Sequence, residues 1–173
     1  TIAAIAAQTY NGSAKTPAPT VTVPLPSGST TTLTKDTDYT VSYSANTNAG
    51  TATVTVTGKG NYTGTKSATF TINKATVTIP SSPSAKTFNK ASQAHGITVP
   101  STASIVTTGS TTSATNVGTY NVILKLNDTA NYKWSDGTTE NKTVTWKINA
   151  YNLSNATIAA IAAQTYNGSA KTP

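Results

Sequence analysis

The stretch TATVTVT at residues 51–57 alternates hydroxyl and apolar side chains without a break. Successive side chains of a β-strand point to opposite faces, so this pattern predicts a strand with one face on a core and the other in water. The same period of two recurs on either side of it, at residues 39–44, 67–73, 120–126 and 144–148. The sequence therefore predicts an all-β fold built from short strands.

Turn-forming residues separate these predicted strands. They read PLPSG at 24–28, GKGN at 58–61, PSSP at 80–83 and SDG at 135–137. Gly, Pro, Asn and Asp each favour the backbone angles of tight turns. Short strands joined in this way, in segments of about 75 residues, are typical of a small antiparallel β-sandwich.

The composition argues against several kinds of partner. The net charge of +7 comes from 12 lysines and no arginine, and no two lysines are adjacent. Nucleic-acid sites normally cluster Lys and Arg, so we expect no nucleic-acid partner and at most a weak attraction to anionic cell-wall polymers. No apolar run approaches the roughly 20 residues that span a bilayer, so no membrane insertion is expected within this segment. Cysteine is absent, so disulfides do not staple the fold.

Residues 1–17, TIAAIAAQTYNGSAKTP, recur without a change at residues 157–173. Identity over such a mixed stretch indicates a tandem array with a period of 156 residues. We expect the chain to be a window of that array that starts inside a strand. On this interpretation residues 150–173 open a further repeat, and a neighbouring copy completes them end to end.

A fainter repeat lies inside each period. Its landmarks keep their order, and the pairs are Tyr10-Asn11 with Phe88-Asn89, Asn48 with Asn116, Gly50-Thr51 with Gly118-Thr119, Asn61-Tyr62 with Asn131-Tyr132, and Phe70 with Trp146. We therefore expect two tandem Ig-like β-sandwich modules, at residues 1–74 and 75–149, followed at 150–173 by the first strand or strands of the next repeat. The strand ending at Lys74 runs into Ala75 without a flexible linker, which predicts a stiff junction.

The ordered landmarks give the chain a family resemblance. Tyr-Asn-Gly near the start, Asn-x-Gly-Thr before a central strand, then Asn-Tyr and a final Thr-aromatic-x-Ile-Asn resemble the MBG-type bacterial Ig-like repeats. The resemblance covers nearly the whole chain and implies an Ig-like sandwich in a large bacterial surface protein or adhesin. It implies an extracellular, cell-surface or cell-wall location, and it supplies no catalytic residue. The second module departs from the pattern, because Lys90 stands where the first has Gly12, which makes its first turn harder to predict.

Few residues have the chemistry of a catalytic or metal site. His95 is the only histidine, and without cysteine it builds neither a zinc site nor a catalytic triad. Asp36 and Asp38 could bind calcium, but turn-entry hydrogen bonds are the expected role. Asp136 and Glu140 could act as the carboxylate pair of a glycosidase, but no pocket-forming pattern accompanies them. We expect no enzyme activity, no cofactor and no metal.

Two aromatic residues are the candidates for ligand contact. Tyr132 and Trp134 could form an exposed platform on which a sugar ring stacks, and each 156-residue period would display this platform once. The alternative for Trp134 is that it covers one end of the sandwich core. A lysine–asparagine isopeptide bond is a further option, with Lys15 or Lys86 near each module's start and Asn73 or Asn149 near its end.

Two functions follow as hypotheses. The first is a rigid spacer in a bacterial surface fibre or adhesin stalk, with neighbouring repeats of the same fibre as its partners. The second is a multivalent adhesin whose modules bind glycan or matrix protein through the Tyr132/Trp134 loop.

Overall fold

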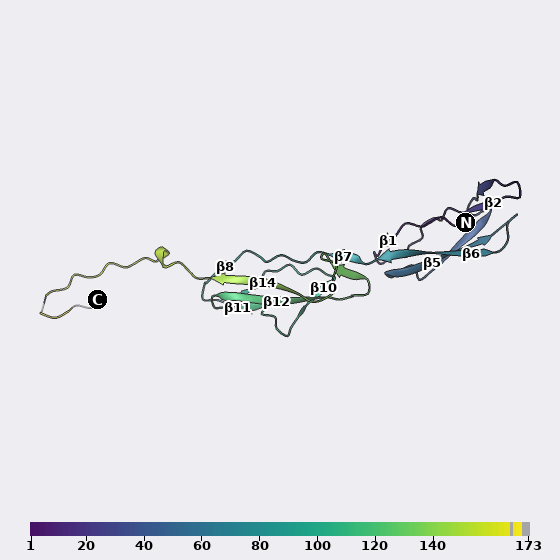
Figure 1. Cartoon of the computed structure of the whole chain (residues 1–173). Helices are drawn as coiled ribbons and strands as arrows, with labels where there is room; N and C mark the ends of the chain where they lie inside the picture. Colours follow the sequence, from purple (N-terminus) through teal and green to yellow (C-terminus); the bar gives the residue numbers. More distant parts are fainter. Residues whose placement is uncertain (167, 171–173) are drawn as a thin grey trace.

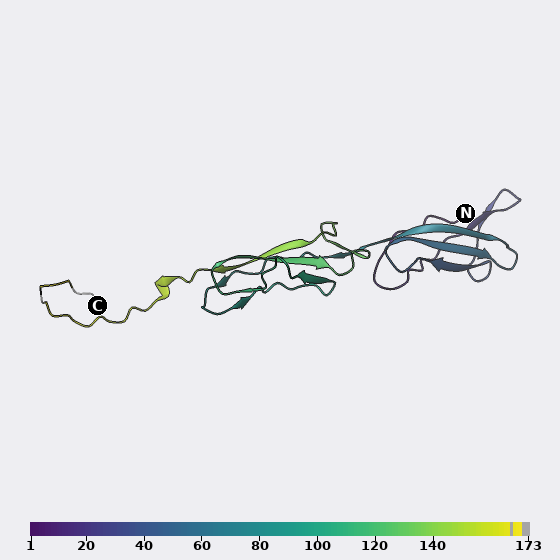
Figure 2. The same ribbon diagram turned by 90° about the horizontal axis from the view of Figure 1, so that it is seen from below.

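The computed structural model describes residues 1–166 and 168–170, and the regular secondary structure of this part is almost entirely β, as predicted. Figures 1 and 2 show its two larger sheets one after the other along a long axis, with the C-terminal residues extending beyond the second sheet. We refer to residues 1–74 as the N-terminal half and to residues 75–149 as the C-terminal half.

The sheet of the N-terminal half has the strand order β1-β6-β5-β4. Its strands are β1 (Gln8–Thr9), β4 (Tyr39–Ser44), β5 (Gly50–Gly58) and β6 (Thr65–Asn73). The predicted alternation is confirmed, since Ala52, Val54 and Val56 are buried while Thr51 and Thr57 are exposed. A separate hairpin joins β2 (Thr22–Pro24) to β3 (Thr30–Thr32).

The sheet of the C-terminal half repeats this arrangement, in the order β10-β12-β14-β8. Its strands are β8 (Lys86–Thr87), β10 (Ala103–Val106), β12 (Gly118–Leu126) and β14 (Lys142–Asn149). A two-stranded sheet of β9 (Gln93–Ala94) and β11 (Ser113–Ala114) accompanies it. The registers also correspond: Ala52 pairs with Phe70 in one half and Tyr120 with Trp146 in the other.

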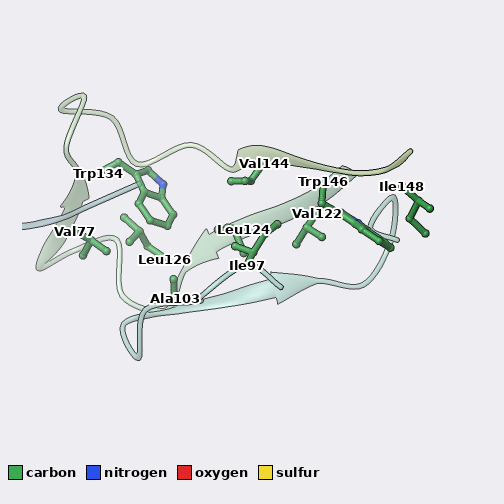
Figure 3. Close-up of a cluster of buried hydrophobic side chains, with 10 residues drawn as sticks. All are labelled: Val77, Ile97, Ala103, Val122, Leu124, Leu126, Trp134, Val144, Trp146 and Ile148. Atoms are coloured by element: carbon green, nitrogen blue, oxygen red, sulfur yellow. The ribbon is translucent and has the colours of Figure 1, made fainter. Parts of the chain in front are cut away.

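The buried side chains form separate clusters along the chain. Two clusters draw all their buried members from residues between Val21 and Ile72, whereas the third lies between Val77 and Ile148. Figure 3 shows this third cluster, with Trp134 and Val77 at one end and Trp146 and Ile148 at the other. Each half therefore buries its own apolar residues.

Parallel pairing at the sheet edges differs from the purely antiparallel arrangement that we expected. β1 is parallel to β6, and β8 is parallel to β14. In addition, β7 (Ala75–Val77) is parallel to β13 (Tyr132–Trp134). Parallel partners need a long crossover rather than a tight turn, so alternation within one strand does not reveal them.

The turn that was hard to predict in the C-terminal half forms as it does in the N-terminal half. Gly12 has a φ of 82° and Lys90 has a φ of 66°, so both lie in the left-handed region. In each turn the asparagine one residue earlier accepts a bond from a backbone N–H, from Ser13 at 3.1 Å and from Ala91 at 3.0 Å. Lys90 thus adopts the left-handed backbone conformation that glycine favours, and the two turns have the same local geometry.

The C-terminal segment does not form the strands that were expected for the opening of the next repeat. Its described residues contain one short 3-10 helix, η1 (Leu153–Asn155), and no strand. Ile158, Ile161 and Tyr166 are exposed, although their sequence copies Ile2, Ile5 and Tyr10 pack against the N-terminal clusters. A strand without its partner gains no ladder hydrogen bonds, so the same sequence stays extended here. Residues 167 and 171–173 of this predicted segment lie outside the described part.

No helix in the described residues is both long enough and apolar enough to cross a bilayer. Completion of the C-terminal segment by a neighbouring copy remains a prediction.

Candidate functional site

The side chain of Asn131 connects the two halves of the chain. It is the one buried polar residue of the described part, only 7% exposed. Its Oδ1 accepts a hydrogen bond from the backbone N–H of Ala49 at 2.8 Å, and its Nδ2 lies 3.4 Å from Oδ1 of Asn48. Because Ala49 belongs to the N-terminal half, a single amide spans the boundary.

Asp128 holds this amide in place. Its Oδ2 accepts a bond from Nδ2 of Asn131 at 2.8 Å, while its Oδ1 accepts from the backbone N–H of Ala130 and of Asn131. The carboxylate accepts only, so it fixes the amide with nitrogen toward Asp128 and oxygen toward Ala49. These bonds, led by that from the Asn131 side chain, lower the pKa of Asp128.

Further contacts join the halves around the amide. The ring of Tyr132 meets the ring of Tyr10 edge to face, with centroids 5.4 Å apart and planes at 86°. Nζ of Lys74 donates to the carbonyl of Thr129 at 2.7 Å, which is a second bond between the halves. Next to it, within the C-terminal half, the N–H of Ala75 donates to the carbonyl of Asn131 at 2.9 Å. We call Tyr10, Asn48, Ala49, Asn131 and Tyr132 the junction.

The two candidate ligand contacts do not form an exposed platform, because Trp134 is buried and Tyr132 is half-buried against Tyr10. Trp134 is 0% exposed, and its indole N–H donates to the carbonyl of Glu140 at 2.8 Å. Tyr132 is half-buried and faces Tyr10. Of the two alternatives for Trp134, the exposed platform is wrong, and a position in the core is confirmed. The physical reason is that β7 lies beside β13 and brings Val77 into the same cluster.

The other candidate residues have local structural roles. Nδ1 of His95 accepts from the N–H of Ile97 at 2.8 Å, and Oδ2 of Asp38 accepts from the N–H of Thr34 at 2.7 Å. Asp36 pairs with its neighbour Lys35 at 3.3 Å. Asp136 binds Lys142 and Thr138, which together lower its pKa to about 2, with the Lys142 bond as the largest cause.

Within the described residues, no group of three or more His, Asp or Glu side chains comes close enough to hold a metal ion. Asn73 and Asn149, the candidate isopeptide partners, are exposed on the outer faces of their strands.

The junction residues were visible in the sequence without being identified as a site. Asn131-Tyr132 and Asn48-Ala49 served only as landmarks of the internal repeat. The signal that could have found them is geometric: Asn-Tyr follows one long strand and Asn-x-Gly-Thr precedes another. Where the halves are joined end to end, the Asn-Tyr motif of the C-terminal half faces the Asn-x-Gly-Thr motif of the N-terminal half.

No family model, no curated protein and no solved structure matches the chain. The geometry around Asn131 is that of a connection between two β-sheet units rather than of a pocket lined by reactive groups.

Proposed function

We propose that the chain is a spacer segment of a bacterial surface fibre or adhesin stalk. In this proposal residues 1–74 and 75–149 are two Ig-like β-sandwich modules, and residues 150–173 open the next repeat. Support comes from the identical stretches at 1–17 and 157–173 and from the matching strand registers of the two halves.

The observation that carries the proposal is the bond between Asn131 and Ala49 across the boundary. The halves are covalently joined through Lys74, which lies between β6 and β7. A second contact close to that connection, through the buried Asn131 amide, opposes bending about it. The edge-to-face pair of Tyr10 and Tyr132 adds an apolar contact at the same level. Two units held at two points keep a fixed angle to each other, so an array of such units stays straight or evenly curved.

The proposed location is the extracellular side of the cell surface or the cell wall. It is supported by the resemblance to MBG-type repeats and by a polar, threonine-rich exposed surface. The proposed partners are neighbouring repeats of the same fibre.

Small-angle X-ray scattering on the chain tests the spacer function. We expect one extended particle whose distance distribution fits a fixed angle between the halves. The matched control carries a Gly-Ser-Gly-Ser insertion between Lys74 and Ala75, and it should scatter as a broad ensemble. The same insertion after Ser27, in the exposed turn between β2 and β3, should leave the inter-half distances unchanged. A wild-type chain that scatters like the Lys74 insertion variant would contradict the proposal.

A further inference from the structure

The cores of the two halves differ at the end where β7 pairs with β13. In the C-terminal half β7 lies against β13, and Val77 of β7 is buried, at 7% exposure, in the cluster that contains Trp134. The counterpart of β13 in the N-terminal half is the segment Tyr62–Gly64, which pairs with no strand in the described part.

An open groove runs beside Tyr62–Gly64. It has a volume of about 190 Å³, and its apolar lining includes Val21, Leu33, Tyr39 and Val56. Gly64 stands where the C-terminal half has Trp134, so position 64 adds no side chain to this end of the N-terminal core, and Tyr39 and Leu33 line the groove that remains. The groove therefore occupies the position that β7 and Trp134 fill in the other half.

The counterpart of β7 lies near the C-terminus of the same chain. Val77 comes five residues after Ile72, the last buried residue of β6, and Leu153 comes five residues after Ile148, the last buried residue of β14. Tyr151-Asn152-Leu153 thus corresponds to Ala75-Thr76-Val77. Leu153 is 80% exposed, and Tyr151 is exposed as well.

The residue sizes at these positions are complementary. Tyr151 and Leu153 are larger than Ala75 and Val77, while Gly64 is smaller than Trp134. A core of normal packing density needs such compensation when one side loses an indole ring. The larger side chains of Tyr151 and Leu153 therefore suit the groove beside Tyr62–Gly64, which no indole ring fills.

The outer end of the C-terminal half resembles the N-terminal side of the junction. An apolar cavity of about 540 Å³ is lined there by Phe88, Val117, Tyr151 and Leu153, among others. Phe88 and Val117 are the counterparts of Tyr10 and Ala49, which contact Tyr132 and Asn131 inside the chain. This end presents a copy of a surface whose partner is already known from the internal junction.

We propose that residues 151–153 of one copy form a parallel strand beside Tyr62–Gly64 of a second copy. Leu153 enters the groove, the N–H of Tyr151 donates to the carbonyl of Asn61, and the ring of Tyr62 packs on Phe88. Each contact reproduces one observed in this chain: the β7–β13 pairing and the bond from Ala75 to Asn131 within the C-terminal half, and the pair of Tyr132 with Tyr10 between the halves.

The inference rests on the proposed function, because it names the surface through which successive repeats join. Asp128 has no counterpart near Asn61, since a two-residue insertion supplies it only in the C-terminal half. Strand pairing and apolar packing therefore hold this second kind of junction, without an oriented amide.

Hydrogen–deuterium exchange on a tandem chain tests the inference. In the tandem chain residues 18–149 follow Pro173, so that a second N-terminal half comes after residue 156. We expect the amide of Tyr151 to exchange at least about tenfold more slowly than in the 173-residue chain, because it gains a strand partner. Equal exchange rates in the two chains would overturn the inference.

Substitutions of Leu153 provide matched variants. In the tandem chain Leu153→Asp should abolish the added protection at Tyr151, whereas Leu153→Val, which places the Val77 side chain there, should keep it. In the 173-residue chain Leu153→Asp should leave the unfolding midpoint unchanged, because Leu153 is exposed. Protection that survives Leu153→Asp would contradict insertion of this side chain into the groove.

The outcomes separate this inference from the spacer function. Slow exchange at Tyr151 in a chain whose halves scatter as a flexible ensemble would support the strand and contradict the rigid spacer. Fast exchange at Tyr151 in a chain with a fixed angle between its halves would contradict the strand and support the rigid spacer.

Discussion

Single residues show how one geometry is built from different side chains. Gly12 and Lys90 occupy the same left-handed turn position, and in both turns the preceding asparagine closes the turn. Glycine adopts this conformation without a steric penalty, whereas a residue with a Cβ pays about 1–2 kcal/mol. The turn in the C-terminal half is therefore held by its surroundings against the preference of Lys90.

Replacing Lys90 by glycine should relieve this strain. We expect Lys90→Gly to raise the free energy of unfolding by about 0.5–1 kcal/mol, since the entropy of the unfolded glycine offsets part of the gain. Lys90→Ala, which keeps the Cβ, is the control and should bring no such gain. Urea denaturation measures both variants. A Lys90→Gly chain that is less stable than the wild type would show that the lysine side chain contributes more than its backbone costs.

At the scale of elements, a loop between β13 and β14 closes one end of the C-terminal core. It follows Trp134, the last residue of β13, whose indole N–H donates to the carbonyl of Glu140 in the loop. Asp136 accepts bonds from Thr138 and pairs with Lys142, the first residue of β14. Hydrogen bonds and an ion pair therefore hold the loop in place over the indole ring, which stays buried.

The ion pair in this loop makes its contribution depend on pH. The pKa of Asp136 is lowered to about 2, chiefly by Lys142, so its stabilising effect is fully present above the ordinary pKa of 3.8. That effect is lost as the pH falls through about 2. We expect Asp136→Asn to reduce the loss of unfolding free energy between about pH 5 and pH 2, measured by denaturation at each pH.

Lys142→Ala is the companion variant for this prediction. By NMR titration the Asp136 carboxyl should titrate closer to its ordinary value in this variant than in the wild type. A wild-type Asp136 that already titrates near 3.8 would contradict the ion pair.

At the scale of the whole molecule, the arrangement of the halves depends on a small junction. The sheets follow each other along one axis (Figures 1 and 2), and the contacts between them come from Lys74, Asn131 and Tyr132. Interfaces of limited size normally leave neighbouring units free to move. Here a direct chain connection and a buried amide restrict that motion together.

Removal of the junction amide should loosen the halves without unfolding them. We expect Asn131→Ala to cost about 1–3 kcal/mol, because it leaves the part-buried N–H of Ala49 and one oxygen of Asp128 without their partner. The amide of Ala49 should then exchange faster with deuterium, and the pKa of Asp128 should rise. Asn61→Ala changes the same Asn-Tyr motif at an exposed position and should alter stability by less than about 0.5 kcal/mol. Unchanged exchange at Ala49 in Asn131→Ala would show that the amide does not hold the junction.

The sequence by itself determined which residues form the long strands and which side of each faces the core. Residues 51–57, 67–73 and 120–126 alternate with the period of a strand, and alternation is a local property that needs no partner. The internal landmarks likewise predicted that the second half would repeat the first, and the matching strand registers agree with this.

Only the tertiary structure decided where Trp134 and Asn131 lie. Their burial depends on β7, a strand more than fifty residues earlier in the chain, and on Ala49 in the other half. Contacts between distant segments leave no periodic trace in either segment. Sequence patterns therefore located the strands, whereas the buried indole and the amide across the junction became visible only when the halves were seen together.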